Sequence, residues 1–124
     1  MPKTYDPTNI FARILRGEIP NKTVLETPHS LAFHDINPLA PVHVLVIPKG
    51  AYVDFDDFAR NATDAEIVDF NRACAKVCEV TGCSPGEGYR AITNAGAHGM
   101  QEVPHYHLHI LGGRVLGRMI ARAD

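Results

Sequence analysis

Apolar side chains recur at helical spacing through one long segment of the chain. They run from Asp64 to Thr81, and Thr63 with Glu66 forms a capping box in front of them. Gly82 follows at the position where helices commonly end. The pattern therefore predicts one long helix over residues 64–81, and its apolar stripe is formed by Ile67, Phe70, Cys74, Val77 and Thr81.

A shorter helix is predicted near the beginning of the chain. Thr8 or Asn9 can cap a helix over Ile10–Arg16, and Gly17 ends it. Its apolar residues share one face of this helix: Ile10, Phe11, Ile14 and Leu15.

Five further stretches have the alternating or continuous apolar pattern that is typical of strands. Pro41–Lys49 is apolar on both faces after His43, which favours a central strand covered on both sides. The strands gather at the two ends of the chain instead of alternating with helices, which predicts an α+β fold with a mainly antiparallel sheet. The other four predicted strands are Thr23–Glu26, Ser30–Ile36, Gly88–Asn94 and His105–Leu111.

Composition narrows the classes of function. A chain of 124 residues predicts a single domain over 1–124. Its formal net charge is −2, without a cluster of Lys and Arg, which argues against nucleic acid as the main partner. The sequence has neither a signal-peptide pattern nor an apolar run near the ~20 residues of a membrane span. Three cysteines without a secretory signal predict reduced thiols and a cytoplasmic location.

The stretch HYHLHIL, residues 105–111, carries the candidate chemistry. In a strand, His105, His107 and His109 share one face, while Tyr106 and Leu108 point into a core. The outer two histidines then lie roughly 13 Å apart, since each residue advances ~3.3 Å, so all three cannot bind one metal ion. The pattern leaves two hypotheses open, a polar sheet face without function or a reactive site.

The reactive hypothesis places His107 at the centre. A histidine that attacks phosphorus must present an unprotonated nitrogen, while its other nitrogen donates to a fixed acceptor. Flanking imidazoles add donors for phosphate oxygens and a proton source. His43, at the start of the central strand, is a candidate fourth imidazole.

The motif His-φ-His-φ-His-φ-φ, in which φ is apolar, resembles the signature of the histidine triad (HIT) superfamily. Three more blocks resemble its Hint branch, the purine nucleoside phosphoramidases, in the family's order: NIFARILRGEIP, LAFHDINPLAPVHVLVIPK and GYRAITNAG. The resemblance implies a homodimer in which two five-stranded sheets join into one of ten strands. It also implies binding of a purine nucleoside monophosphate of the AMP or GMP type. No metal or other cofactor is expected, because the imidazoles can stabilise charge and transfer protons.

The resemblance also implies a role for each matching residue. His107 would attack the α-phosphorus and form a nucleotidyl-histidine that water hydrolyses. His109 and His43 would contact the phosphate and assist proton transfer, and His105 would orient the site. Asp35 would accept both ribose hydroxyls. Asn94 and the loop Gly99–Val103, which includes Gln101, Glu102 and Val103, match the phosphate-side segment. The wall around the base matches Ile10, Phe11, Ile14, Phe33, His34 and Ile36.

Two features depart from the family pattern. The phosphoramidase branch usually has Gly-Gln-Ser before the triad, whereas this chain has Met100, Gln101 and Glu102. An ionised glutamate cannot donate a hydrogen bond, so Glu102 either points away from the site or meets a cationic leaving group. The C-terminus also lacks the Trp-Pro-Pro ending of the animal proteins.

Three alternatives to a phosphoramidase remain open at the level of the sequence. The chain could hydrolyse dinucleoside polyphosphates with the same nucleophile. It could be a nucleotide-binding or scaffold protein that does not catalyse a reaction. It could also be a small metal-binding β protein that uses two of the triad histidines.

Overall fold

The computed structural model describes residues 3–122, and one five-stranded sheet is at its centre. The strands lie in the order β1-β2-β3-β5-β4, and every neighbouring pair is antiparallel. The predicted α+β fold with an antiparallel sheet is therefore confirmed. The strands are β1 (Thr23–Glu26), β2 (Ser30–His34), β3 (Val42–Pro48), β4 (Tyr89–Ile92) and β5 (Leu108–Gly112).

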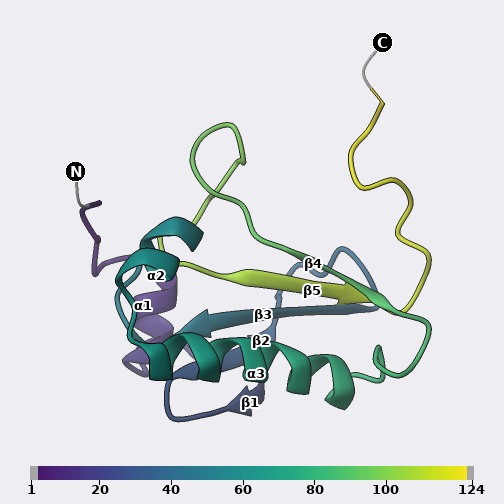
Figure 1. Ribbon diagram of the computed structural model, residues 1–124, viewed down its shortest axis with the longest axis horizontal. Helices are drawn as coiled ribbons and strands as arrows, with labels where there is room; N and C mark the ends of the chain where they lie inside the picture. Colours follow the sequence, from purple (N-terminus) through teal and green to yellow (C-terminus); the bar gives the residue numbers. More distant parts are fainter. Residues whose placement is uncertain (1–2, 123–124) are drawn as a thin grey trace.

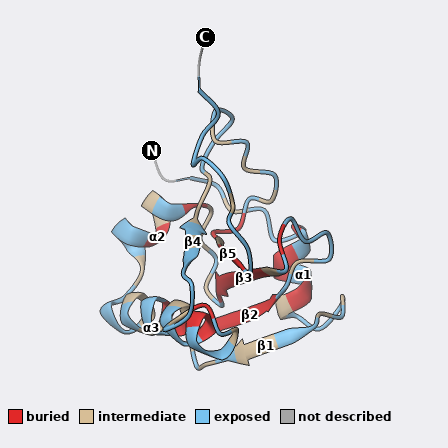
Figure 2. Ribbon diagram, turned by 90° about the vertical axis from the view of Figure 1, so that its right-hand side faces the viewer, coloured by how far each residue is buried: buried red, intermediate tan, exposed pale blue. Residues whose placement is uncertain are grey.

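Three helices accompany the sheet, α1 (Ile10–Leu15), α2 (Phe55–Asn61) and α3 (Asp64–Val80). The long helix α3 runs across one face of the sheet, and the C-terminal segment extends away from it (Figure 1). In the view turned by 90°, α3 and α1 lie on opposite sides of β2 and β3 (Figure 2). The central strand β3 is thus covered on both faces, as its continuous apolar pattern predicts.

The larger core fills the space between the sheet and α3. Alternate residues of β3 and β5 point into this layer, where they pack against the helix because side chains of a strand alternate between faces. The predicted capping box is present, with the Thr63 hydroxyl accepting from the Glu66 N–H and the Glu66 carboxylate accepting from the Thr63 N–H. Buried members of this layer include Val44, Val46, Phe58, Phe70, Val77, Tyr106 and Ile110.

A smaller core lies on the opposite face, beneath α1. The Asn9 side chain caps this helix by accepting a hydrogen bond from the Ala12 N–H at 2.9 Å. The apolar face of α1 then packs against β2 and β3, and the contacting residues are Phe11, Ile14, Leu31, Phe33, Leu45 and Ile47. His43 and His109 belong to this face of the sheet, since His109 is paired with Leu45 across β3 and β5.

The sequence did not predict α2. Its N-cap is Asp54, whose side chain accepts a hydrogen bond from the Asp57 N–H at 3.0 Å. The helix has only seven residues, and only Phe58 among them is buried. One buried residue cannot establish a helical period, so the cap was the sole signal in the sequence.

The last strand begins later than predicted, at Leu108 instead of His105. Its ladder with β3 ends at the pair Val46 and Leu108, just before Pro48, which has no N–H to extend the sheet. The Tyr106 N–H donates instead to the main-chain oxygen of Tyr52 at 2.7 Å. Two triad histidines therefore lie before the strand. The other element ends differ from the prediction by at most two residues.

Among residues 3–122, no helix combines the length and the apolar character that crossing a bilayer requires.

Candidate active site

A cavity of about 620 Å³ opens beside α1, on the face of the sheet that carries His43 and His109. Every predicted site residue except His105 lines it. The cavity therefore gathers side chains from α1, β2, β3, the β4–β5 connection and β5. The predicted residues that line it are Ile10, Phe11, Ile14, Phe33, His34, Asp35, Ile36, His43, Asn94, Gln101, Glu102, Val103, His107 and His109.

The His107 ring is buried among these lining residues, with 7% of the residue exposed. Its Nδ1 lies 2.7 Å from the main-chain oxygen of His105. A carbonyl oxygen can only accept, so Nδ1 carries the ring hydrogen and Nε2 keeps its lone pair. No hydrogen bond joins Nε2 to any residue between 3 and 122. The neutral ring thus offers an unprotonated nitrogen to the cavity.

Two further contacts hold this segment in place. The ring of Phe11 stands edge-on to the His107 ring, with centroids 5.0 Å apart. The Thr93 hydroxyl donates to the main-chain oxygen of His107 at 2.7 Å. His107 is therefore held through its ring by α1 and through its main chain by Thr93, the residue after β4.

His43 and His109 form a second pair of imidazoles. The Leu39 N–H donates to His43 Nδ1 at 3.1 Å, so the hydrogen of the neutral His43 ring is on Nε2. That Nε2 lies 2.9 Å from His109 Nδ1, which must then accept. The hydrogen of His109 is therefore on its Nε2. This chain of two hydrogen bonds leaves His109 with an N–H that can donate to an anion in the cavity.

Burial keeps these imidazoles neutral. Burial lowers the pKa of His107, and the negative charges of Asp35 and Glu102 partly oppose that effect. Burial, together with the His107 and His43 rings, lowers the pKa of His109 to about 4. The pKa of His43 is also lowered by burial, against an opposing effect of Asp35. Near neutral pH the site therefore presents lone pairs and N–H donors instead of imidazolium cations.

His105 lies outside the cavity and has no exposed surface. Its Nε2 lies 2.8 Å from the main-chain oxygen of Pro48, at the end of β3. Burial lowers the pKa of this ring to about 4, although the bond to Pro48 works in the opposite direction. The residue is therefore placed to support the His107 segment, and it does not face a ligand.

Asp35, His43 and His109 offer one ligand atom each within 4.8 Å of one another, and are the one group of this kind in the described part of the chain. A metal on His43 Nε2 would have to displace the ring hydrogen, because the Leu39 N–H already occupies Nδ1. The ring would then become an imidazolate. These side chains therefore fit the hydrogen-bonded relay from Leu39 through His43 to His109 better than a resident metal ion.

Asp35 follows β2 at the side of the cavity. One of its oxygens accepts from the Asn37 N–H at 2.8 Å, and the other lies 3.5 Å from His43 Nε2. The carboxylate is thus held by the main chain while its second oxygen remains available. Beside it, Ile36 is 85% exposed, so residues 3–122 cover little of this large apolar side chain.

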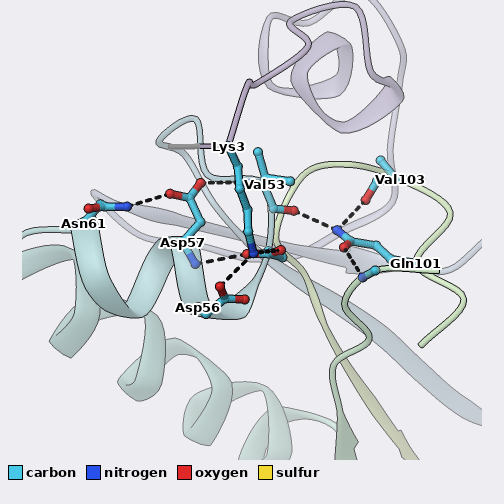
Figure 3. Close-up of polar contacts among 9 residues, drawn as sticks. Lys3, Val53, Asp56, Asp57, Asn61, Gln101 and Val103 are labelled. Atoms are coloured by element: carbon cyan, nitrogen blue, oxygen red, sulfur yellow. Dashed lines mark hydrogen bonds and ion pairs between the residues drawn. The ribbon is translucent and has the colours of Figure 1, made fainter. Parts of the chain in front are cut away.

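The loop before the triad is fixed by Gln101. Its amide nitrogen donates to the main-chain oxygens of Val53 at 2.7 Å and Val103 at 3.0 Å (Figure 3). Its side-chain oxygen accepts from the Gly96 N–H at 3.4 Å. Gln101 was predicted as a nucleotide-binding residue, but its polar atoms are engaged in bracing this loop.

Met100, next to Gln101, is the one non-glycine residue with a positive φ, 57°, in the described part of the chain. It is 76% exposed and lines the cavity. A residue with a side chain is strained in this left-handed region of backbone conformation. Because the Met100 side chain is largely exposed, little apolar burial offsets the free-energy cost of that strain.

Several groups that build the site carry no signal in the sequence. The carbonyl of His105, the carbonyl of Pro48 and the N–H of Leu39 are main-chain atoms, which every residue possesses. Only the folded chain shows which of them meet an imidazole. Met100, from the predicted loop Gly99–Val103, also lines the cavity. Further lining residues that were not predicted to bind nucleotide are Ile19, Pro20, Asn21, Asn37, Leu39 and Leu45.

The family model of the HIT domain matches residues 16–116 of this chain. The chain belongs to the HIT family. It is 61% identical to an uncharacterized HIT-like protein of Azospirillum brasilense, over 98% of this chain and 99% of the relative. It is 41% identical to the purine nucleoside phosphoramidase of Escherichia coli, over 90% of this chain and 92% of that protein.

Solved structures of similar sequence have the same fold. A HIT family hydrolase from Legionella pneumophila superposes with a TM-score of 0.79 at 38% identity, over 86% of this chain and 94% of the other. A histidine triad protein from Clostridium difficile superposes with a TM-score of 0.79 at 37% identity, over 93% of this chain and 98% of the other. The predicted membership of the superfamily is therefore confirmed.

Proposed function

We propose that this protein is a nucleotidyl hydrolase that cleaves the P–N bond of purine nucleoside 5′-phosphoramidates. The observation that carries the proposal is the neutral His107 ring, whose Nδ1–H is held by the His105 carbonyl while Nε2 is left with its lone pair. The name of the Escherichia coli relative, purine nucleoside phosphoramidase, supports the same reaction class.

The reaction would proceed in two displacements. His107 Nε2 attacks the α-phosphorus, a P–Nε2 bond forms, and the P–N bond to the leaving amine breaks. The departing nitrogen takes up one proton. Water then attacks the same phosphorus, the P–Nε2 bond breaks, and the proton that water releases balances the one taken up before. The nucleoside monophosphate leaves, and His107 returns to its neutral form.

The other imidazoles would stabilise charge during both steps. The Nε2–H of His109 is the donor left by the relay from Leu39 through His43. It would bind a phosphate oxygen or the departing nitrogen as charge develops there. Because these donors are already oriented by the chain, they need no reorganisation at the moment of reaction. The proposed chemistry therefore uses side chains alone and assigns no role to a cofactor.

The remaining lining residues fit a nucleoside. A carboxylate can accept from two neighbouring hydroxyls, so the free oxygen of Asp35 suits a ribose. Exposed Ile36, with Ile10 and Phe33, would cover the flat faces of a purine, which removes apolar surface from water. We propose that Asn94 and the 101–103 segment border the phosphate, with Gln101 acting through the loop that it braces.

Hydrolysis of dinucleoside polyphosphates is the second candidate reaction. Its leaving group carries several negative charges, whereas the leaving group of a phosphoramidate is an amine. The charge of Glu102 is close enough to oppose the lowering of the His107 pKa. A like charge at this point disfavours a polyphosphate leaving group, so the electrostatics support the phosphoramidate.

We also propose that each chain acts as one HIT domain within a homodimer. Among residues 3–122, strand β4 is at the edge of the sheet and is paired only with β5, so its outer side offers unpaired main-chain groups to a second chain. Tyr89 on this strand is 50% exposed. Pairing of two such edges would give a sheet of ten strands. Light scattering coupled to size-exclusion chromatography measures the oligomeric state directly. A monomer at micromolar concentration would contradict the proposed homodimer.

Steady-state turnover of two substrates tests the proposed reaction. Purified protein is assayed with an adenosine 5′-phosphoramidate and with a diadenosine polyphosphate, and kcat/KM is compared. The proposal predicts faster turnover of the phosphoramidate, and none by His107→Ala. Preference for the polyphosphate would favour the second reaction, and binding of AMP without turnover of either compound would favour a non-catalytic protein.

A further inference from the structure

The N-terminal segment, residues 3–9, is fixed to the body of the protein at both ends. The Lys3 ammonium forms ion pairs with the carboxylates of Asp54 and Asp56, the latter at 2.7 Å (Figure 3). At the other end Asn9 caps α1 and donates through its side chain to the main-chain oxygen of Asp6 at 2.7 Å. The segment therefore spans from the beginning of α2 to the beginning of α1.

Tyr5 lies in the middle of this segment, and its hydroxyl is 2.6 Å from His105 Nδ1. The two rings meet edge-on, with centroids 5.6 Å apart. The roles of the two atoms follow from the other nitrogen of the imidazole. His105 Nε2 lies 2.8 Å from the carbonyl oxygen of Pro48, so Nε2 carries the hydrogen and Nδ1 accepts. The Tyr5 hydroxyl is therefore the donor.

This hydrogen bond satisfies a nitrogen that has no access to water. His105 has no exposed surface, and no buried side-chain nitrogen or oxygen lacks a partner among residues 3–122. Loss of the hydroxyl would leave the Nδ1 lone pair buried without a donor, which is costly. The ring could escape that state only by rotating or by moving its hydrogen, and either change would break the bond to Pro48.

The main chain of His105 links this ring to the reactive centre. Its carbonyl oxygen accepts the Nδ1–H of His107 at 2.7 Å and so fixes the tautomer of the proposed nucleophile. A shift of His105 would therefore displace the acceptor that keeps His107 Nε2 unprotonated. Tyr5 is not among the residues that line the cavity, so it acts on the reaction only through His105.

We propose that Tyr5 is a positioning residue, which holds the His105 ring through its hydroxyl and thereby fixes the His107 side chain for attack. The inference rests on the proposed function for its effect on rate, but the hydrogen bond itself can be tested without any substrate. The N-terminal segment then contributes to the site although it lies outside the matched range of the HIT domain, which begins at residue 16.

The test compares two substitutions that each remove one tyrosine hydroxyl. Tyr5→Phe removes the donor to His105, and Tyr52→Phe removes a donor to the Glu66 carboxylate, 2.8 Å away in the wild type. Both variants lose a partly buried hydrogen bond, so their midpoints of thermal unfolding are expected to fall. Only Tyr5→Phe is expected to change the site.

Nitrogen-15 NMR of the histidine rings is the first readout. In the wild type, His105 Nε2 is expected to give the signal of a protonated nitrogen and Nδ1 that of a hydrogen-bonded acceptor. In Tyr5→Phe the His105 Nδ1 signal is expected to shift, while Tyr52→Phe leaves it in place. A wild-type spectrum with the hydrogen on Nδ1 would overturn the inference, even if Tyr5→Phe did not fold.

The single-turnover rate of AMP transfer to the protein is the second readout. Loss of one hydrogen bond at a buried acceptor is expected to slow transfer about tenfold in Tyr5→Phe. The affinity for AMP should be unchanged, since Tyr5 does not line the cavity. An unchanged rate together with an unchanged His105 signal would overturn the inference. Absence of any adduct in the wild type would instead count against the proposed function.

Discussion

His107 Nδ1 donates to the main-chain oxygen of His105, only two residues before it, over 2.7 Å. The bond explains why the spacing of the two histidines matters. The carbonyl belongs to the same short segment as the ring, so the tautomer of His107 does not depend on a distant side chain. Because a carbonyl cannot donate, the neutral ring always directs its lone pair from Nε2.

The pH dependence of AMP transfer should reflect the buried state of this ring. Burial lowers the pKa of His107 from its usual value near 6.5. Protonation removes the nucleophile, so the rate is expected to fall as pH drops, with an apparent pKa below 6.5. Single-turnover rates measured across acidic pH provide the test. An acidic limb at or above 6.5 would contradict a buried, neutral nucleophile.

Stability is also expected to fall with acid, because of His105. Its pKa is about 4 in the folded protein, against about 6.5 in an unfolded chain. Because the pKa of His105 is lower in the folded protein, the unfolded state binds the proton first as the pH falls. The contribution of His105 to the free energy of unfolding is therefore lost between pH 6.5 and 4, and there is no further loss below pH 4. The contribution of this group is up to about 3 kcal/mol of the free energy of unfolding.

NMR titration of His105 combined with urea unfolding checks this prediction. The His105 ring should titrate well below 6.5, and the free energy of unfolding should fall through the same window. His98→Gln, which removes an exposed histidine instead of a buried one, is the control variant. Titration of the His105 ring near 6.5 would count against the described burial.

Asp35→Asn should remove discrimination between ribose and deoxyribose. The amide keeps an oxygen for the Asn37 N–H but can no longer accept from two hydroxyls. Loss of hydrogen bonds to a charged group is expected to lower kcat/KM for the ribonucleotide by about 10- to 100-fold. The 2′-deoxy substrate should lose less, so the ratio of the two kcat/KM values should approach one. An unchanged ratio would place the ribose elsewhere.

The left-handed backbone of Met100 reverses the usual order of alanine and glycine. Alanine is normally the more stabilising of the two, but at a φ of 57° its Cβ is strained. Met100→Gly should therefore be more stable than Met100→Ala by about 1 kcal/mol. Urea unfolding of both variants provides the comparison. Greater stability of the alanine variant would show that the residue is not held in this conformation.

The sequence predicted the elements whose apolar pattern extends over several residues. Helix α3 was bounded by its capping box and by Gly82, and the alternating pattern placed the three triad histidines on the side opposite Tyr106 and Ile110. A short element was not predicted, because its apolar pattern covers too few residues. Helix α2 buries only Phe58 from its seven residues, so no period was visible.

The site was predicted only in part, because much of it is built from main-chain atoms and long-range contacts. The family resemblance named residues that the structure brings to one cavity. It did not indicate that the Leu39 N–H orients His43, or that Tyr5, a hundred residues earlier in the chain, meets His105. Such pairings depend on the folded geometry, and no local pattern predicts them.

Mass spectrometry of the intact protein after rapid quenching tests the central claim most directly. The wild type, mixed with an adenosine 5′-phosphoramidate, should gain the mass of one AMP in an acid-labile bond. His107→Ala should gain no AMP mass, and calorimetry should show that this variant still binds AMP. An adduct that persists in His107→Ala, or turnover by the wild type without any adduct, would contradict attack by His107.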